Sequence, residues 1–109
     1  MIIYKGTFGV PFAWKLCQPD GKTPYNLEGK TVTFRLWRQT DPNELLINGK
    51  CVITDAEEGK VEYLIKKGEF DKHGEYWAQF VAFEEDVDNV PFTPFLIQVR
   101  NTAVPQEGA

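Results

Sequence analysis

Apolar and polar residues alternate at every second position along most of this chain. In the segment Lys30 to Arg38 the apolar positions are Val32, Phe34 and Leu36, and polar residues stand between them. A period of two predicts a strand with one buried face and one wet face. The pattern recurs in segments separated by Gly, Asn, Asp and Pro, whose apolar members include Phe12, Trp14, Leu16, Val61, Tyr63, Ile65, Tyr76, Ala78, Phe80, Phe95, Ile97 and Val99. The chain is therefore predicted to be all-β, an antiparallel sandwich of about seven strands without a long helix.

Four segments are less regular. Ile2 to Val10 is predicted as the first strand of its own sheet, with an arm that pairs with a neighbouring subunit as the alternative. Gln39 to Glu44 is predicted as a turn, and Asn48-Gly49 as a bulge or a tight turn within an extended stretch. Lys66 to Gly74 is predicted as a charged connection anchored by Phe70.

The composition fits one packed domain that has neither nucleic acid nor a membrane as its partner. The chain has 109 residues, of which 42% are apolar and 14% aromatic, and this suffices for a hydrophobic core. Residues 1–100 are predicted to form the domain, and residues 101–109, which lose the periodicity, an irregular tail. The net charge of −4 provides no basic field for phosphate backbones, and the apolar runs are too short to cross a bilayer as a helix.

The cysteine content and the N-terminal residues favour production in a reducing cytoplasm. Cys17 and Cys51 are too few for a disulfide framework, so two free thiols are predicted. Met1 to Lys5 lacks the basic start and the long apolar stretch of a secretory signal.

Residues that could support catalysis or bind a metal are sparse. His73 is the one histidine, and it lies in a charged connection without an activating partner, which favours a surface or capping role. No Cys/His spacing resembles a zinc site, and no Gly-rich loop resembles a phosphate cradle. The acidic run Glu84 to Asn89 carries oxygen ligands of the kind calcium prefers, yet it lacks the spacing and the glycine of a known calcium loop. We therefore expect a solvated hairpin tip there, and no enzymatic activity, metal or cofactor.

Three aromatic residues are candidates for a binding surface. Trp37 and Trp77 fall on the outward positions of their strands, and Val81 and Phe83 are predicted to extend the face of Trp77. Exposed aromatic groups rimmed by polar ones often mark a docking surface. The alternative, with equal weight, is that loops or the N-terminal segment cover them. A sugar-stacking platform is a further interpretation, which ranks below protein contact because no Asp/Asn cluster accompanies these tryptophans in the sequence. We take Trp37, Trp77 and Phe83 as the predicted partner surface.

One short motif is typical of immunoglobulin domains. The segment Gly74-Glu75-Tyr76-Trp77-Ala78 resembles the Gly-x-Tyr-x-Cys signature that leads their penultimate strand. The resemblance implies an Ig-like sandwich in which the tyrosine hydroxyl bonds back to the backbone. Ala78 stands at the position of the cysteine, so the disulfide between the sheets is not expected.

A longer, ordered set of motifs resembles the Ig-like N-terminal domain of phage upper baseplate proteins and related tail modules. The resemblance covers most of the chain, and its specificity lies in the order of its elements, each of which is one strand with its turn. The elements are Phe12-Ala13-Trp14-Lys15-Leu16, Asp20-Gly21, Asn26-Leu27-Glu28-Gly29, Val32-Thr33-Phe34-Arg35-Leu36, Ile53-Thr54-Asp55, Gly59-Lys60-Val61-Glu62-Tyr63, Gly74 to Phe80 and Phe95 to Val99.

This resemblance implies a non-enzymatic structural protein of a phage virion, assembled in the host cytoplasm. Its partners would be other virion proteins, with a homo-oligomer as an open alternative. Members of the family usually continue into a helical linker and further domains, whereas this sequence ends soon after its last strand. An accessory subunit of the baseplate or tail, or a capsid decoration subunit, is therefore expected. The functional alternative is a carbohydrate-binding or host-adhesion module.

Overall fold

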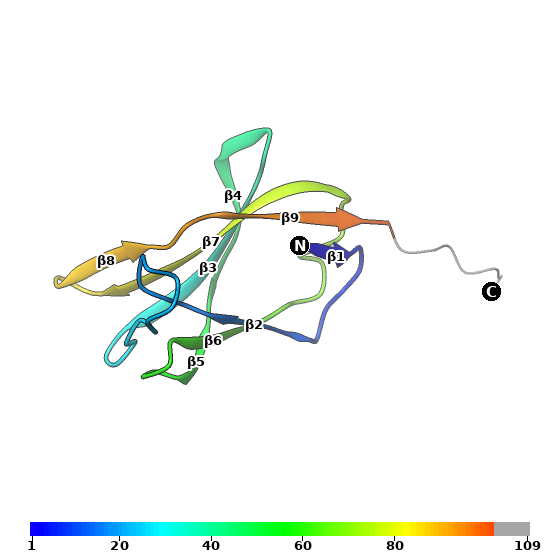
Figure 1. The fold of residues 1–109 in the computed structure, drawn as a ribbon. Helices are drawn as coiled ribbons and strands as arrows, with labels where there is room; N and C mark the ends of the chain where they lie inside the picture. Colours follow the sequence, from blue (N-terminus) through cyan, green and yellow to red (C-terminus); the bar gives the residue numbers. More distant parts are fainter. Residues whose placement is uncertain (102–109) are drawn as a thin grey trace.

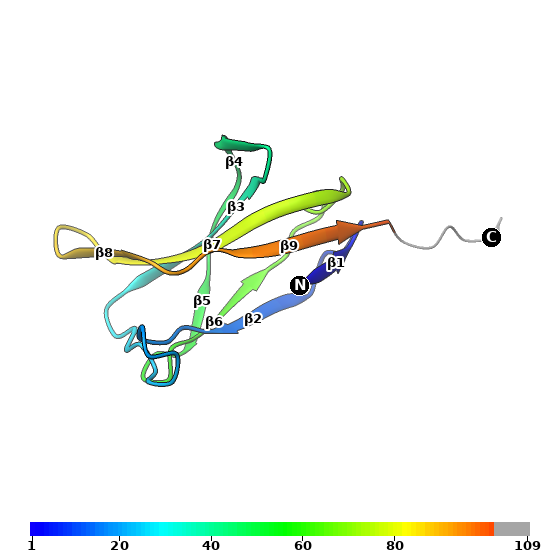
Figure 2. The same ribbon diagram turned by 45° about the horizontal axis from the view of Figure 1, so that its top comes forward.

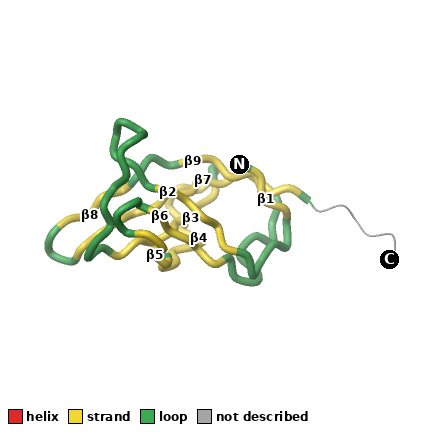
Figure 3. Tube along the Cα trace, turned by 60° about the horizontal axis from the view of Figure 1, so that its bottom comes forward, coloured by secondary structure: helices red, strands yellow, loops and turns green. Residues whose placement is uncertain are grey.

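The computed structural model describes residues 1–101, and in that range two packed layers of strands occur without a helix (Figure 1, Figure 3). The strands of this range are β1 (Ile2–Tyr4), β2 (Pro11–Lys15), β3 (Thr31–Arg38), β4 (Asp41–Lys50), β5 (Val52–Asp55), β6 (Lys60–Leu64), β7 (Gly74–Glu84), β8 (Asp88–Pro91) and β9 (Phe95–Arg100). The predicted all-β, Ig-like sandwich is confirmed, with nine strands in the described range where about seven were expected. The predicted tail, apart from Asn101, lies outside the described residues.

The larger sheet has six strands in the order β1-β9-β7-β3-β4, and β8 also pairs with β7. The smaller sheet has the order β2-β6-β5 and forms the second layer (Figure 2). Two strands pair with the same side of β7. β9 pairs with its first half and β8 with its second half, and the segment that joins β8 to β9 leaves a break between them. The strand pairs are antiparallel except for β1, which runs parallel to β9.

The core lies between the two sheets and consists of the inward positions of the period-two pattern. Phe34 of β3 and Phe80 of β7 are register partners, and both are fully buried. Phe34 stacks on Tyr63 of the smaller sheet, with 4.9 Å between the ring centroids. Phe12, also from the smaller sheet, lies 5.6 Å from Phe34 and 6.2 Å from Phe80. These contacts join the two layers, and burial of each such side chain stabilises the fold by about 1.5–3 kcal/mol.

A tyrosine corner holds the connection that precedes β7, as the Ig-like motif implies. Tyr76 is buried, and its hydroxyl donates a hydrogen bond of 2.6 Å to the carbonyl oxygen of Lys72. The guanidinium of Arg38 lies over the Tyr76 ring, 5.4 Å from its centroid. Phe70 anchors the same connection in the core, as predicted. The charged segment between β6 and β7 is therefore held by the core at Phe70 and fastened to the larger sheet where it enters β7.

The prediction for Asn48 and Gly49 is wrong, because both lie in the regular part of β4 and pair with β3. The register shift in this pair falls elsewhere, next to Trp37. Gly49 serves a different purpose: a Cβ atom there would lie 2.3 Å from Cε1 of Tyr63, so only glycine lets the ring rest on the backbone of β4. The turn predicted from Gln39 to Glu44 is also too long, since β4 already begins at Asp41.

The N-terminal residues form the first strand of their own sheet, as predicted, but this strand covers only Ile2–Tyr4 of the predicted segment Ile2 to Val10. Ile2, Ile3 and Tyr4 pair with the last strand, β9, and Ile3 is buried against the core. The main-chain amide of Gln98 donates a hydrogen bond to the carbonyl oxygen of Met1, which extends this pairing to the first residue. The alternative of an arm directed only at another subunit is therefore not supported for these residues.

Lys30 neutralises part of the acidic hairpin tip between β7 and β8. Its ammonium group contacts Glu84 at 3.3 Å and also binds Asp88, and the hydrogen bond with Asp88 raises the pKa of Lys30 above its ordinary value. Asp86 adopts a positive φ of 63° and turns the chain at the tip. Within residues 1–101, no group of three or more His, Cys, Asp or Glu side chains is placed to hold a metal ion.

Both cysteines are free thiols, as predicted, and their surroundings differ. Cys51 is buried in the core, and burial raises the pKa of its thiol to about 12. Cys17 is half-buried in the loop after β2, where it forms an isolated bridge with Pro24.

Replacing Tyr76 with Phe removes the donor of the corner bond while keeping the ring. The free energy of unfolding should fall by about 1–2 kcal/mol in urea denaturation, since the Lys72 carbonyl loses its partner in a partly buried place. Tyr4→Phe, at an exposed tyrosine, should change it by less than about 0.5 kcal/mol. Equal values for the two variants would mean that the corner bond contributes nothing.

The two thiols should react at different rates with a thiol reagent such as DTNB at pH 8. Cys17 should react in the folded protein, whereas Cys51 should react only after unfolding, because it is covered and stays protonated at that pH. In Cys17→Ser, no rapidly reacting thiol should remain. Two fast thiols in the folded wild type would contradict the buried position of Cys51.

Candidate docking face on the six-stranded sheet

A row of four apolar residues crosses the outer face of the larger sheet. Trp37 of β3 and Trp77 of β7 are register partners. Leu45 of β4 pairs with Trp37 on one side, and Leu96 of β9 pairs with Trp77 on the other. Directly opposite residues have Cβ atoms about 4.5–5.5 Å apart, so the four side chains are immediate neighbours. We call them the tryptophan row: Leu45, Trp37, Trp77 and Leu96.

The row faces outward because its sequence neighbours fill the core. Leu36, Ala78 and Ile97 are completely buried, and successive side chains of a strand point to opposite faces. Trp37 and Trp77 are half-buried, and Leu45 is 47% exposed. The sequence-based prediction that the two tryptophans lie on the outer face therefore agrees with the geometry. A continuous exposed apolar patch of this kind is typical of an interaction site.

A shallow pocket of about 340 Å³ lies on the row. Trp37, Trp77, Gln39, Pro42 and Pro94 line it. Two indole rings and two prolines make its walls apolar and stiff, and the Gln39 amide is the one polar side chain among the lining residues. Such a pocket suits an apolar or aromatic side chain of a protein partner.

Unlike charges flank the row on its two sides. Arg35 lies two residues before Trp37 on β3, and Glu75 lies two residues before Trp77 on β7. Because β3 and β7 are antiparallel, the two charges lie on opposite sides of the row. The register partner of Arg35 is Gln79, which is four residues, or about 13 Å, from Glu75. Within residues 1–101 neither Arg35 nor Glu75 forms an ion pair, and Nε of Arg35 is buried without a hydrogen-bond acceptor.

Phe83, the third predicted surface residue, lies apart from the other two. It pairs with Thr31 near the far end of β7, six residues or about 20 Å from Trp77. Val81 between them is only 1% exposed, contrary to the prediction that it extends the face of Trp77. Val81 lies between two register partners, Thr33 of β3 and Pro91 of β8, because β8 pairs with this half of β7. The structure thus brings Trp37 and Trp77 together and separates Phe83 from them.

Sequence reasoning missed the other members of the patch. Leu96 alternates with the inward Phe95 and Ile97, so the period-two pattern contained the signal for its outward position. Leu45 faces Trp37 only because of the register shift beside it, which the local sequence does not reveal. Pro42 falls in the predicted turn Gln39 to Glu44, and only the fold places Pro42 and Pro94 beside the indoles.

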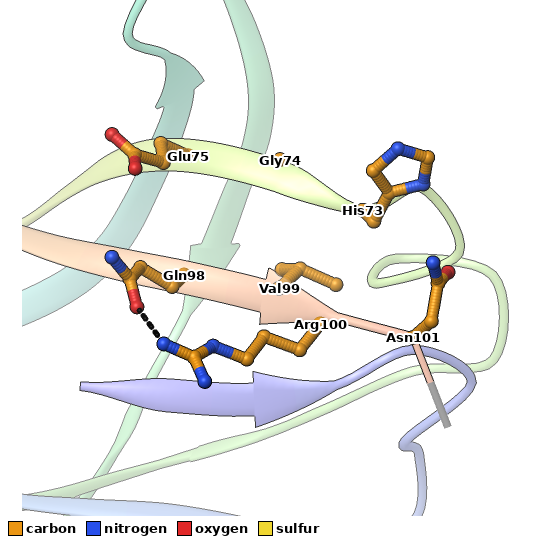
Figure 4. A pocket seen from close by; sticks show the side chains of 7 residues that line it. All are labelled: His73, Gly74, Glu75, Gln98, Val99, Arg100 and Asn101. Carbon is orange, nitrogen blue, oxygen red and sulfur yellow. Dashed lines mark hydrogen bonds between the residues drawn. The ribbon is translucent and has the colours of Figure 1, made fainter. Parts of the chain in front are cut away.

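The pocket beside His73 is lined by no hydroxyl or thiol side chain. A shallow pocket of about 380 Å³ is lined by His73, Gly74, Glu75, Gln98, Val99, Arg100 and Asn101, which include no Ser, Thr or Cys (Figure 4). His73 and Glu75 lie at opposite ends of it, so they do not converge on a common point (Figure 4). The guanidinium of Arg100 donates a hydrogen bond of 3.1 Å to the side chain of Gln98. The lining of this pocket therefore contains no Ser–His, Thr–His or Cys–His pair.

A second groove, of about 590 Å³, runs between the loop after β2 and the chain that joins β8 to β9. Its aromatic rings pack on one another: Trp14 stacks on Phe95 at 4.5 Å, and Tyr25 meets Phe92 edge-on at 5.2 Å. These packed rings close the edge of the core. Because they already have partners within the chain, the tryptophan row remains the stronger candidate for docking. Within residues 1–101 no helix is long and apolar enough to span a membrane.

The fold is an Ig-like sandwich with an apolar row on the outer face of its larger sheet, and the sequence comparison assigns its family. The model of the BppU N-terminal domain, the N-terminal domain of phage baseplate upper proteins, matches residues 20–106. The chain belongs to this family, so it is a phage baseplate structural domain and a component of the virion. The resemblance noted in the sequence motifs is confirmed.

No curated protein matches the chain. Among solved structures, that of murine CRIg is similar over 93% of this chain and 92% of its own, with 13% identity and a TM-score of 0.40. No functional conclusion follows from a likeness at this level.

Replacing Trp77 with Thr should leave the fold intact, because the side chain lies on the outer face and Thr favours strands. The free energy of unfolding should fall by less than about 1.5 kcal/mol in urea denaturation. The matched core variant Phe80→Ala, on the same strand, should lose about 3–5 kcal/mol. A comparable loss in both would place Trp77 in the core and remove it from the docking face.

Proposed function

We propose that this chain is a non-enzymatic accessory subunit of a phage baseplate or tail that docks by protein–protein contact through the tryptophan row. The observation that carries the proposal is the cross-strand pair of Trp37 and Trp77, extended to four strands by Leu45 and Leu96. Aromatic anchors at the centre of a patch, surrounded by polar groups, contribute most of the binding energy in protein interfaces. Assembly would take place in the host cytoplasm, in keeping with the two free thiols.

The mechanism is removal of the row from water against a repeated partner in the virion. The half-buried tryptophans already have part of their surface packed, so little side-chain entropy is lost when a partner covers the rest. Several weak contacts in one particle add up through effective concentration, so no single site needs high affinity. Phe83 stays a secondary candidate, since a partner that covers the row must extend about 20 Å along β7 to reach it.

Binding of a carbohydrate is the second candidate function, and the paired indoles are the observation that favours it. Aromatic faces can stack on sugar rings, and the pocket at the row contains two of them. Sugar hydroxyls also need several polar partners, however, and Gln39 is the one polar side chain among the residues that line the pocket. A protein partner therefore ranks first. Saturable glycan binding at sub-millimolar concentration would reverse the order.

The test is binding of the purified chain to virions that lack it. Trp77→Thr should reduce binding at least about tenfold while the protein stays folded, because the centre of the row becomes polar. Val52→Thr makes the same kind of change at an exposed residue of the smaller sheet and should bind like the wild type. If both variants bind normally, docking does not occur through the tryptophan row.

A further inference from the structure

We propose that the partner at the tryptophan row is the same row of a second copy of this chain, and that Arg35 of each copy forms an ion pair with Glu75 of the other. The pairing deepens the proposed function and rests on it, because it uses the same face and assigns its occupant. It would give a symmetric dimer in which the two six-stranded sheets meet face to face.

The positions of the two charges select one symmetry. Two sheets that meet face to face with their strands aligned can be related by a two-fold axis along the strands or by one along the row. With an axis along the strands, Arg35 of both copies lies on one side of the row and Glu75 of both copies lies on the other. Like charges then lie on the same side. An axis along the row reverses the strand direction and brings Glu75 of one copy to the side of Arg35 in the other. Only the second arrangement sets unlike charges against each other.

This axis also places the apolar residues against their equals. Each member of the row meets the same residue of the second copy, so Trp37 faces Trp37 and Trp77 faces Trp77. Such self-complementarity is what an isologous two-fold interface requires. Packed sheets lie about 10 Å apart, and Arg35 and Glu75 occupy neighbouring strands about 4.8 Å apart, so the long arginine side chain can bridge the layers.

The charges have a reason to pair across the interface. Within residues 1–101 neither Arg35 nor Glu75 has an ion-pair partner, and about 13 Å separates their positions within one chain. Arg35 is already half-buried, with its Nε unpaired, so a carboxylate from outside would satisfy a group that is largely desolvated. The net charge of −4 on each copy opposes association at long range, and this repulsion is screened at physiological salt.

The experiment is sedimentation equilibrium of the full chain at about 0.15 M salt, where exposed charges are screened. The wild type should form a dimer. Arg35→Glu and Glu75→Arg should each weaken the dimer at least about tenfold, because each places like charges against each other twice. An equimolar mixture of the two variants should associate like the wild type, since both carboxylates of the first variant then meet arginines of the second. The doubly exchanged variant should dimerise by itself, because each of its two ion pairs is restored with the charges reversed.

Matched controls separate this local effect from net charge and from unfolding. Lys22→Glu and Glu85→Arg make the same charge changes at exposed residues away from the row, and both should dimerise like the wild type. Circular dichroism melting verifies the fold of each variant. Should Arg35→Glu fail to fold, Arg35→Gln keeps the long side chain, and it should weaken the dimer without being rescued by Glu75→Arg.

A wild type that remains monomeric up to about 0.5 mM overturns the pairing, and so does a mixture of folded single variants that fails to associate. If the chain is monomeric while Trp77→Thr still abolishes virion binding, the row binds a different virion protein and the proposed function stands. If the dimer forms and the mixture is rescued while Trp77→Thr binds virions normally, the pairing stands and the proposed function fails.

Discussion

The pairing of β3 with β7 is the constraint on which both the core and the tryptophan row depend. One register sets Phe34 opposite Phe80 toward the second sheet and Trp37 opposite Trp77 toward solvent. Because the side-chain period of a strand is two, a slip of one residue would exchange the two faces and bury polar groups in place of rings. The free energy gained by burying the phenylalanines therefore also holds the tryptophans in line. The row therefore needs no further contact to align its two tryptophans.

The smaller sheet and its connections keep this pairing rigid. Tyr63 of β6 rests on the backbone of Gly49 and donates a hydrogen bond of 2.6 Å to Glu69 in the following connection. The Tyr76 hydroxyl fastens the other end of that connection to the larger sheet. A binding surface on paired strands holds its side chains more precisely than one on loops, since each position is fixed by hydrogen bonds on two sides. The row is therefore largely organised before a partner arrives.

A sheet face, rather than a cleft, suits the work of a baseplate subunit. The family assigns the chain to the virion. If the row docks against a repeated partner, as proposed, a modest patch is enough, because effective concentration replaces the affinity that a single contact lacks. In the proposed dimer, the unlike charges on the two sides of the row would fix the orientation of the two copies, since charge complementarity selects register and partner more than it adds affinity.

Local pattern accounts for the strands, the inward rings, the outward tryptophans and the tyrosine corner, because period-two alternation and short turn motifs are properties of consecutive residues. The same logic explains the errors. Asn48 and Gly49 look like a turn, yet their place is decided by the Tyr63 ring, which comes from another strand and another sheet. Val81 has outward parity, yet β8 folds back beside it. That Leu45, Trp37, Trp77 and Leu96 form one row, with Arg35 and Glu75 on opposite sides, follows from strand order and register, and these depend on contacts between residues far apart in the chain. The sequence by itself determined which side chains face out; only the tertiary structure decided which of them meet.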